Sequence, residues 1–410
     1  MKNVIDALMM RLLPWRRIGR DLQGLEARLL KRFDASEQTV ASELDRQRGQ
    51  IDALITRQDR SFEKAGQQIL DAVALLRPKR LFISTGYFAT AMAAAIAHQQ
   101  SRKFDDYLLV TIDRQSGADN SQWAYQVSDD WTDVQTIVHE QYYERASGSA
   151  ALPFADIEFD EVYSPFVEMA EFVEKEFSAR RYHFYEEGLT SYLQALRFAP
   201  PRQDSRFFAL APTAMRRASV STSPIDNAAF RRAMQRASQC YRIPRFAGQR
   251  NIVIVTTGAT PADSPDPVAM LDQYNELTAS LLAKGYSVWV KGHPRMPLGE
   301  AFPQSKLAQM GARLLETDAP LLETVIACNP RSITAIVSVY SSILAHAFAL
   351  FGIPAFSVRG GTVSEGQVWW KAVQDAIVPD AAELSNAEPD DIERVAHDFH
   401  NRNLAWEPPV

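Results

Sequence analysis

The chain has 410 residues, which is too long for one compact core and fits two domains of ordinary size with an additional segment. Its hydrophobic share of 46% and charged share of 23% exclude a low-complexity or broadly disordered protein, and its net charge of −6 gives no general attraction for nucleic acid. The two cysteines, Cys240 and Cys328, lack metal-ligand spacing and are too few for a disulfide framework, so we expect a cytoplasmic protein.

Residues 1–33 are predicted to form a basic amphipathic helix. Apolar residues recur there every three or four positions, and the segment carries a net charge of +5. Charged residues interrupt its apolar stretch, so we do not expect a secretory signal. A basic face opposite Trp15 and the leucines favours peripheral attachment to the inner face of the cytoplasmic membrane, whose lipids are anionic. Docking of this helix on the protein's own body is the alternative.

Residues 34–76 predict a long polar helix. Glycine and proline hardly interrupt the segment, and its apolar residues form a sparse stripe that is nearly heptad, including Leu44, Ile51 and Ile69. Such a helix forms a short coiled coil, which would make the chain a homo-oligomer, or it lies against the first domain. The sequence leaves these two alternatives open.

Alternating strands and helices begin at residue 77. Residues 77–200 predict a first α/β domain, in which RLFIS, YLLVTID, FDEVYSP and YHFYEEG are strands. Residues 201–250 predict a basic linker region with ten arginines and a net charge of +8. Residues 251–385 predict a second α/β domain with the strands NIVIV, YSVWVKG and TAIVSV, and 386–410 a C-terminal helix and tail.

The fold class predicted from this order is α/β. We expect two Rossmann-like, doubly wound domains that face a cleft, with an N-terminal helical extension. Ligands of such sheets bind beyond the carboxyl ends of the strands. The most apolar window, 333–358, is long enough to span a bilayer, but its hydroxyl residues, His346 and Pro354 favour a strand, a helix and a second strand. We therefore expect no transmembrane helix.

The first motif that could carry chemistry is Glu186-Glu187-Gly188, directly after the strand YHFY. Adjacent carboxylates repel each other, and a raised pKa on one of them would suit a general base acting on a hydroxyl group. Gly188 permits a turn or a close backbone approach. An ordinary acidic loop is the alternative for this motif taken alone.

The second motif is Lys291-Gly292-His293-Pro294-Arg295, at the end of the strand SVWV. A lysine, an imidazole and an arginine within five residues could bind a phosphate, and Pro294 would hold the histidine loop rigid. His293 could also donate a proton to a leaving phosphate. A basic turn without a ligand is the alternative.

The third motif is Ser341-Ser342, where the helix after TAIVSV is expected to begin. One serine would cap the helix, and the free amides of its first turn would form an anion site. Ordinary capping is the alternative. The turn Thr256-Thr257-Gly258, after the first strand of the second domain, is a weaker candidate for the same ligand.

In this order and on these elements, the three motifs resemble those of the bacterial CMP-sialic acid-dependent sialyltransferases, in particular the capsular polysialyltransferases and the lipooligosaccharide sialyltransferases. The resemblance covers roughly residues 79–380. It implies a GT-B fold, inversion at the anomeric carbon, and neither a metal nor another cofactor. It also implies an enzyme of capsule polysaccharide biosynthesis that uses a nucleotide-sugar donor.

The resemblance also implies residue roles. Glu186 would be the general base, because the family's base is the first acid of the motif. His293 would bind or protonate the departing CMP phosphate, assisted by Lys291. Contacts to the donor are further expected from Lys291, Pro294, Ser341, Ser342, Thr257 and Gly258. On the acceptor side we expect Glu187 and Gly188.

The arginines of residues 201–250 suggest what the acceptor is. The pairs Arg216-Arg217 and Arg231-Arg232 would provide a cationic track for an anionic glycan or glycolipid, such as a growing sialic acid polymer. Such a track would favour repeated over single transfer. Solvated arginines on a surface helix are the alternative.

Two other functions stay open. Transferases that use CMP-Kdo or CDP-glycerol for capsule and teichoic acid synthesis share a His-Pro and a Ser-Ser motif, so the second domain alone indicates a cytidine nucleotide rather than a particular sugar. A noncatalytic membrane-associated scaffold with a transferase-like fold is the other alternative. No nucleic-acid partner is expected.

Overall fold

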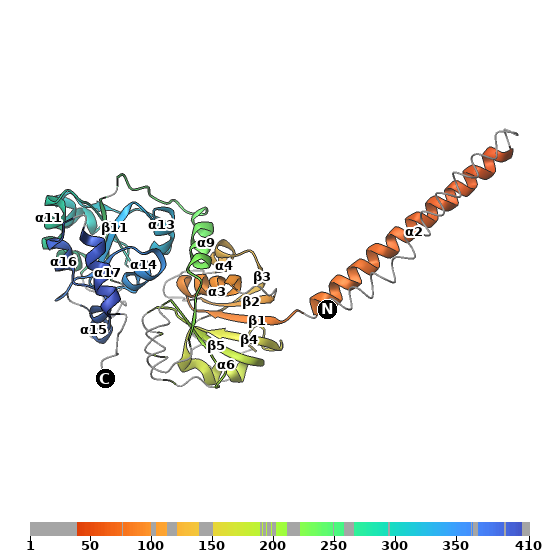
Figure 1. Cartoon of the computed structure of the whole chain (residues 1–410), viewed down its shortest axis with the longest axis horizontal. Coiled ribbons are helices and arrows are strands. Elements are labelled where there is room, and N and C mark those ends of the chain that lie inside the picture. Colours follow the sequence, from red (N-terminus) through yellow and green to blue (C-terminus); the bar gives the residue numbers. More distant parts are fainter. Residues whose placement is uncertain are drawn as a thin grey trace. The chain divides into compact units, whose positions relative to one another are not determined.

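The structure is a computed structural model, shown in Figure 1. The residues that it describes are 39–75, 77–99, 104–112, 121–138, 151–188, 191, 194, 198, 202–210, 222–248, 250–257, 266–293, 296–361, 363, 368–388 and 391–403. The chain forms two separate compact units, one ending at Arg77 and the other beginning at Pro78.

The described part of the first unit is a single helix, α2 (Thr39–Leu75), within the segment where the sequence predicts a polar helix. At about 1.5 Å of rise per residue it extends over roughly 55 Å. Leu54, Ile55 and Leu70 are exposed on it. The basic helix expected for residues 1–33 lies outside the described residues, so membrane attachment and the coiled coil stay predictions. Within the described ranges, no helix is long and apolar enough to cross a membrane.

The second unit begins with a seven-stranded parallel sheet. Its strand order is β3-β2-β1-β4-β5-β6-β7. The strands are β1 (Lys79–Ser84), β2 (Asp105–Ile112), β3 (Trp131–Val138), β4 (Phe159–Ser164), β5 (Ala179–Tyr185), β6 (Phe207–Ala209) and β7 (Thr222–Pro224). Leu81, Phe82 and Ile83 of β1 have no exposed surface, as expected for a strand of a parallel sheet that is covered on both faces.

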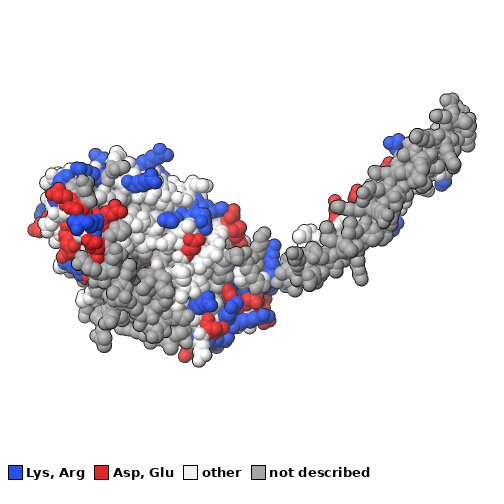
Figure 2. All heavy atoms as spheres, viewed as in Figure 1, with Lys and Arg blue, Asp and Glu red and all other residues white. Residues whose placement is uncertain are grey.

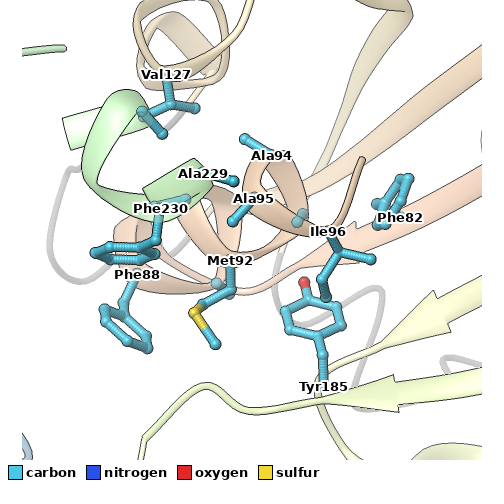
Figure 3. Packing of buried hydrophobic residues seen from close by; sticks show 14 of the residues in the cluster. Phe82, Phe88, Met92, Ala94, Ala95, Ile96, Val127, Tyr185, Ala229 and Phe230 are labelled. Atoms are coloured by element: carbon cyan, nitrogen blue, oxygen red, sulfur yellow. The ribbon is translucent and has the colours of Figure 1, made fainter. Parts of the chain in front are cut away.

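Helices cover this sheet: α3 (Tyr87–Gln99), α4 (Ser121–Val127), the 3-10 turn η1 (Val167–Met169), α6 (Ala170–Glu176) and α9 (Asn227–Ser238). The alanines of α3 bring it close to both the sheet and α9. Figure 3 shows Phe88 of α3 beside Phe230 of α9, with ring centroids 5.5 Å apart. The same hydrophobic cluster includes Ala327 and Leu350 from the later part of the chain, so the two α/β halves of this unit share buried apolar surface.

Residues 201–250 differ from the basic linker that the sequence predicts. β6 and β7 extend the first sheet, and α9 packs against α3 and α4. The reason is that α9 is amphipathic: Phe230 and Met234 are fully buried on one side, while Arg231 and Arg232 are exposed on the other. In the sequence, the many arginines make this inward-facing apolar stripe difficult to recognise.

The second α/β half contains a five-stranded parallel sheet in the order β10-β9-β8-β11-β12. The strands are β8 (Asn251–Val255), β9 (Ser287–Lys291), β10 (Arg313–Leu314), β11 (Ile333–Ser338) and β12 (Ala355–Ser357). Around it lie α10 (Pro267–Asp272), α11 (Asn275–Ala283), η2 (Phe302–Gln304), α12 (Lys306–Met310), α13 (Leu322–Cys328), α14 (Ile343–Phe351), α15 (Val368–Ile377), α16 (Ala381–Asn386) and α17 (Ile392–Asn403).

The strand orders confirm the predicted fold class. When the strands of each half are numbered along the chain, both sheets contain the spatial order 3-2-1-4-5. This is the order of doubly wound, Rossmann-like sheets. The apolar window at 333–358 forms the strand β11, the helix α14 and the strand β12, as predicted. All three sequence motifs lie at or near the carboxyl ends of strands, where such sheets bind ligands: the motifs at 186–188, 291–295 and 341–342 come at the ends of β5, β9 and β11.

Candidate active site

The acidic motif begins where β5 ends. Glu186 is only 1% exposed, so its carboxylate points into the protein. Its backbone N–H donates to the carbonyl oxygen of Phe208 at 2.9 Å, and its Oε2 accepts from the backbone N–H of Leu210 at 2.8 Å. The segment at the end of β6 thus holds Glu186 through both its backbone and its side chain.

The adjacent Glu187 has different surroundings. It is half-buried, and its backbone N–H donates to the hydroxyl of Ser191 at 2.9 Å. A β-carbon added at Gly86, in the turn between β1 and α3, would lie 3.5 Å from Oε1 of Glu187. One acid of the motif is therefore enclosed, and the other lies beside the turn that follows β1.

His346, on α14, lies between Glu186 and a second carboxylate. Its Nδ1 is 3.1 Å from Oε1 of Glu323 on α13, and its Nε2 is 3.4 Å from Oε1 of Glu186. The contact to Glu186 is at ion-pair distance without the alignment of a hydrogen bond, and Nε2 has no hydrogen-bond partner within the described residues. The imidazole stacks on the ring of Phe88, with centroids 4.0 Å apart.

These neighbours decide the charge of His346. Its burial lowers its pKa, but Glu186 and Glu323 more than offset this and raise the pKa of His346 to about 9. The imidazole is therefore an imidazolium at neutral pH. An enclosed group of two carboxylates and one cation results, in which each acid has a positive neighbour.

Lys291, from the second motif, adds a further charge to this group. It is the last residue of β9 and is 8% exposed, and its Nζ lies 3.4 Å from the carbonyl oxygen of Gly292. Burial lowers the pKa of Lys291, whereas the nearby carboxylate of Glu323 acts in the opposite direction. Glu323 thus acts electrostatically on both Lys291 and His346, and through them it links the second motif to the first.

The first and third motifs are in direct contact. Gly188 has φ +146°, a conformation that other residues rarely adopt. A β-carbon added there would lie 3.6 Å from both Cβ and Oγ of Ser342. The acidic motif of the first sheet and the serine motif of the second therefore meet at this glycine.

The two serines of the third motif differ in their bonding. The backbone N–H of Ser341 donates to Oε1 of Gln374 at 2.8 Å, and its hydroxyl accepts from the N–H of Ile343 at 3.4 Å. Ser341 thus caps the helix start and has an occupied amide. Ser342 makes no side-chain capping bond, and no described residue bonds its amide. The anion site at this helix start stays a prediction, for which Ser342 is the better candidate because the amide of Ser341 is bonded to Gln374.

His293 is positioned through its backbone. Its N–H donates to Oγ1 of Thr256 at 3.1 Å, and its carbonyl oxygen accepts from Met296 at 2.8 Å. Thr256, at the end of β8, in turn donates its N–H to the carbonyl oxygen of Lys291 at 3.0 Å. Thr257 is buried and its Oγ1 lies 3.5 Å from the sulfur of Met270, so it is directed into the core.

Some residues of the predicted site are not among the described residues. Gly258, Pro294, Arg216 and Arg217 lie outside the described residues. On the face shown in Figure 2, basic and acidic side chains are interspersed over the described atoms.

Arg231 and Arg232 are not brought to the three motifs. Arg231 donates to the carbonyl oxygen of Leu350 at 3.3 Å, near the end of α14 opposite to Ser342. Arg232 pairs with Asp226 at 3.6 Å, and both side chains are largely exposed. Arg231 thus has a structural partner of its own, and neither arginine contacts a residue of the motifs within the described chain.

Sequence reasoning missed Glu323, His346 and Gln374 as site residues. His346 follows Ser342 by four positions on an otherwise apolar helix, and a single histidine on such a helix is a signal that could have been followed. Glu323 and Gln374 carry no comparable signal, because their helices are not next to a motif in the sequence. Among the described residues there is no group of three or more His, Cys, Asp or Glu side chains that could hold a metal ion.

Comparison with known protein families identifies the family of this chain. Residues 80–359 match the family described as Alpha-2,8-polysialyltransferase (POLYST), and this range contains all three motifs. A search of curated proteins gives no significant match.

Several solved structures are similar to this chain at low sequence identity. The UDP-N-acetylglucosamine 2-epimerase of Rickettsia bellii is 10% identical, with 80% of this chain and 95% of that chain covered and a TM-score of 0.44. UGT89C1 of Arabidopsis thaliana, complexed with UDP, is 12% identical over 80% and 93% of the two chains, with a TM-score of 0.43. The wall teichoic acid polymerase TagF is 9% identical over 85% and 92%, with a TM-score of 0.38. The strand orders of the chain itself carry the fold assignment.

Proposed function

Because the chain belongs to the alpha-2,8-polysialyltransferase family and is thus a glycosyltransferase of GT-B type, we propose that it transfers sialic acid from CMP-sialic acid to a hydroxyl group of a glycan acceptor. The proposed transfer inverts the anomeric carbon and uses no metal ion. The acceptor oxygen attacks that carbon, its bond to the phosphate oxygen of CMP breaks, and the hydroxyl proton passes to a base.

The observation that carries this proposal is the meeting of the three motifs. Gly188, after a strand of the first sheet, lies against Ser342, after a strand of the second sheet. Glu186 pairs with His346, which follows Ser342 by one turn on α14. Lys291 lies close enough to Glu323, the other partner of His346, for the carboxylate to act on its charge. These contacts support a site in which an acid would serve the acceptor and cationic and hydroxyl groups would serve a nucleotide phosphate.

On the acceptor side, we assign the general base to Glu186. Its Oε2 accepts from the backbone N–H of Leu210, and its Oε1 faces Nε2 of His346 at 3.4 Å, so both oxygens of the proposed base have fixed neighbours. The enclosure of Glu186 suits a base, because exclusion of water strengthens its interactions with the developing charge. Glu187 is half-buried and is assigned to binding the acceptor.

On the donor side, we assign the CMP phosphate to Ser342, His293 and Lys291. Ser342 offers a hydroxyl and an amide at the start of α14, where a helix favours a bound anion. His293 is half-buried and is held by its backbone, so that its ring could stabilise or protonate the leaving phosphate. Ser341 supports this site indirectly, because its hydroxyl and amide are engaged in shaping the helix start.

Polymerisation and attachment to the membrane extend the proposal. The family's described activity suggests repeated transfer, and the arginines of residues 201–250 would hold an anionic acceptor. The basic segment 1–33 would place the enzyme at the inner surface of the cytoplasmic membrane, next to a glycolipid acceptor. Capsule polysaccharide synthesis is the process that such a donor, acceptor and location would serve.

A donor screen with the purified full chain tests the proposed function. CMP-sialic acid, CMP-Kdo and CDP-glycerol are each incubated with an oligosialic acid acceptor, with release of the nucleotide and the mass of the acceptor as readouts. We expect nucleotide release and acceptor growth with CMP-sialic acid, unchanged by a metal chelator. Transfer only from one of the other donors would replace the assigned sugar, and no turnover of any donor would favour the scaffold function.

A further inference from the structure

The position of His346 is not explained by the roles assigned so far. Its backbone N–H donates to the carbonyl oxygen of Ser342 at 3.1 Å, as part of the helix α14. Its ring is enclosed, since the residue is 2% exposed, and lies between two carboxylates. A buried histidine can be satisfied by backbone groups alone. Here its two ring nitrogens instead face Glu186 from the end of β5 and Glu323 from α13.

Charged and uncharged groups of several elements face His346. From α3, the ring of Phe88 stacks on it and carries no charge. The carboxylates of Glu186 and Glu323 face its two ring nitrogens, and Glu323 also acts electrostatically on Lys291 at the end of β9. Among the described residues, these interactions link two carboxylates, an imidazolium and an ammonium group.

We propose that His346 is a positioning residue for Glu186: as an imidazolium it orients this carboxylate and balances its charge, and Glu323 in turn orients the imidazolium. This inference rests on the proposed function, in which Glu186 receives the acceptor proton. His346 itself is not assigned contact with either substrate.

Two geometric observations support the role. Glu323 makes the shorter of the two contacts, with its Oε1 3.1 Å from Nδ1 of His346, so it fixes the orientation of the ring. The other ring nitrogen, Nε2, is buried, has no hydrogen-bond partner among the described residues and faces Oε1 of Glu186 at 3.4 Å. A contact of this length, without full alignment, lets the carboxylate adjust toward a bound hydroxyl while its counter-charge stays in place.

The charge state supplies a signature that a merely structural histidine would not give. Burial acts to lower the pKa of His346, and the two carboxylates raise it to about 9. The imidazolium therefore persists through neutral pH and is lost at alkaline pH. When it is lost, Glu186 retains its negative charge but loses its partner, so transfer should decline along an alkaline limb near that pH.

The main experiment compares His346→Gln with the parent in full-length enzyme. Turnover is measured from pH 5 to 10, with KM for the donor, CMP affinity and melting temperature. We expect kcat to fall about 10- to 100-fold, the size that misplacement of a reacting group commonly causes, while CMP affinity stays within about three-fold. The alkaline limb should disappear, because the variant has no imidazolium at this position that could lose its proton.

A matched control variant is His183→Gln. His183 is also buried, at 5% exposed, but its surroundings lower its pKa to about 4, mainly through burial. It lies on β5, three positions before Glu186, and its Nδ1 accepts from the backbone N–H of Arg206 at 3.2 Å. This variant should keep the parent's pH profile. Lys291→Arg serves as a second control, since a guanidinium does not titrate in this range, and an alkaline limb that persists in it belongs to His346 rather than to Lys291.

Glu323→Gln tests the proposal if His346→Gln does not fold. It keeps the shape of the side chain and removes one of the two carboxylates that stabilise the imidazolium. We expect the alkaline limb to move to lower pH. An unchanged limb in Glu323→Gln, or a parent-like rate and profile in a folded His346→Gln protein, would overturn the proposal.

The outcome also distinguishes this inference from the proposed function. If Glu186→Gln abolishes transfer while His346→Gln is parent-like, the base assignment stands and the positioning role fails. If Glu186→Gln remains active, the base assignment itself fails. In the double variant, the fold loss in activity should be much smaller than the product of the losses in the two single variants, because both substitutions disable the same carboxylate.

Discussion

Gly188 lies directly against Ser342, so that a β-carbon on the glycine would stand 3.6 Å from the serine hydroxyl. This contact joins the acidic motif of the first sheet to the serine motif of the second. Since Ser342 is the residue to which we assign the donor phosphate, the backbone at Gly188 forms a boundary between the acceptor and donor sides of the site.

We expect Gly188→Ala to lower transfer activity and CMP affinity together. The methyl group would occupy space next to Ser342, and φ +146° disfavours any side chain, at a cost of about 1–3 kcal/mol in stability. Activity, calorimetric CMP affinity and melting temperature are the measurements. Gly248→Ala is the control for backbone strain, because Gly248 also has positive φ but has nothing within 4 Å of an added β-carbon. Equal CMP affinities in both variants would contradict the boundary role of Gly188.

The two serines should respond differently to substitution by alanine. Ser342→Ala should weaken CMP binding by roughly 1.5–3 kcal/mol, the usual value of a hydrogen bond to a charged group. Ser341→Ala should instead lower stability by about 1 kcal/mol with a smaller effect on binding, because this hydroxyl accepts from the N–H of Ile343. Calorimetric titration with CMP and thermal denaturation separate the two effects. The reverse order of CMP affinities would move the phosphate site to Ser341.

Replacement of His293 by alanine should severely weaken use of the donor. Its ring is assigned to the leaving phosphate, whereas its backbone N–H, which bonds Thr256, remains in the variant. The loop should therefore stay in place. We expect a loss of about 100-fold or more in kcat, as for removal of a general acid. CMP release from CMP-sialic acid measures it, and a loss of only a few-fold would remove the acid role.

The strands and the motifs could be predicted from the sequence, because apolar runs such as that of β1 end in polar turns. The group around His346 could not, since Glu186, Glu323 and His346 come from three elements that only the packing of the two halves brings together. The arginines of residues 201–250 led to the prediction of a basic linker there, because the local composition outweighed the apolar pattern. They dominate the composition of a segment whose buried face, including Phe230 and Met234, is what places it in the fold.

The arginines also provide a test of polymerisation. We expect the products to become shorter as salt rises, because exposed charges are screened beyond about 10 Å at 0.1 M. Arg216, Arg217, Arg231 and Arg232 changed together to Gln should shorten them further. Arg236→Gln is the control, since Arg236 lies on the same helix and pairs with Asp129 at 2.9 Å. If the parent adds only one residue, or neither change affects product length, single transfer replaces polymerisation.

Removal of residues 1–33 should release the protein from anionic liposomes while activity on a soluble acceptor persists. The net charge of +5 and the apolar periodicity of this segment are the reasons. Cosedimentation at low salt measures the release, with neutral liposomes as the control. Equal binding of full-length and shortened protein to anionic liposomes would contradict membrane attachment through this segment.

The most direct test of the central claim is transfer of sialic acid from CMP-sialic acid to an oligosialic acid acceptor by the parent, Glu186→Gln and Glu187→Gln under single-turnover conditions. Each substitution replaces a carboxylate by a neutral group of the same shape. We predict transfer by the parent, a loss of about 100-fold or more in Glu186→Gln, and a smaller loss in Glu187→Gln. No transfer by the folded parent, or a Glu186→Gln enzyme within a few-fold of it, would contradict the account.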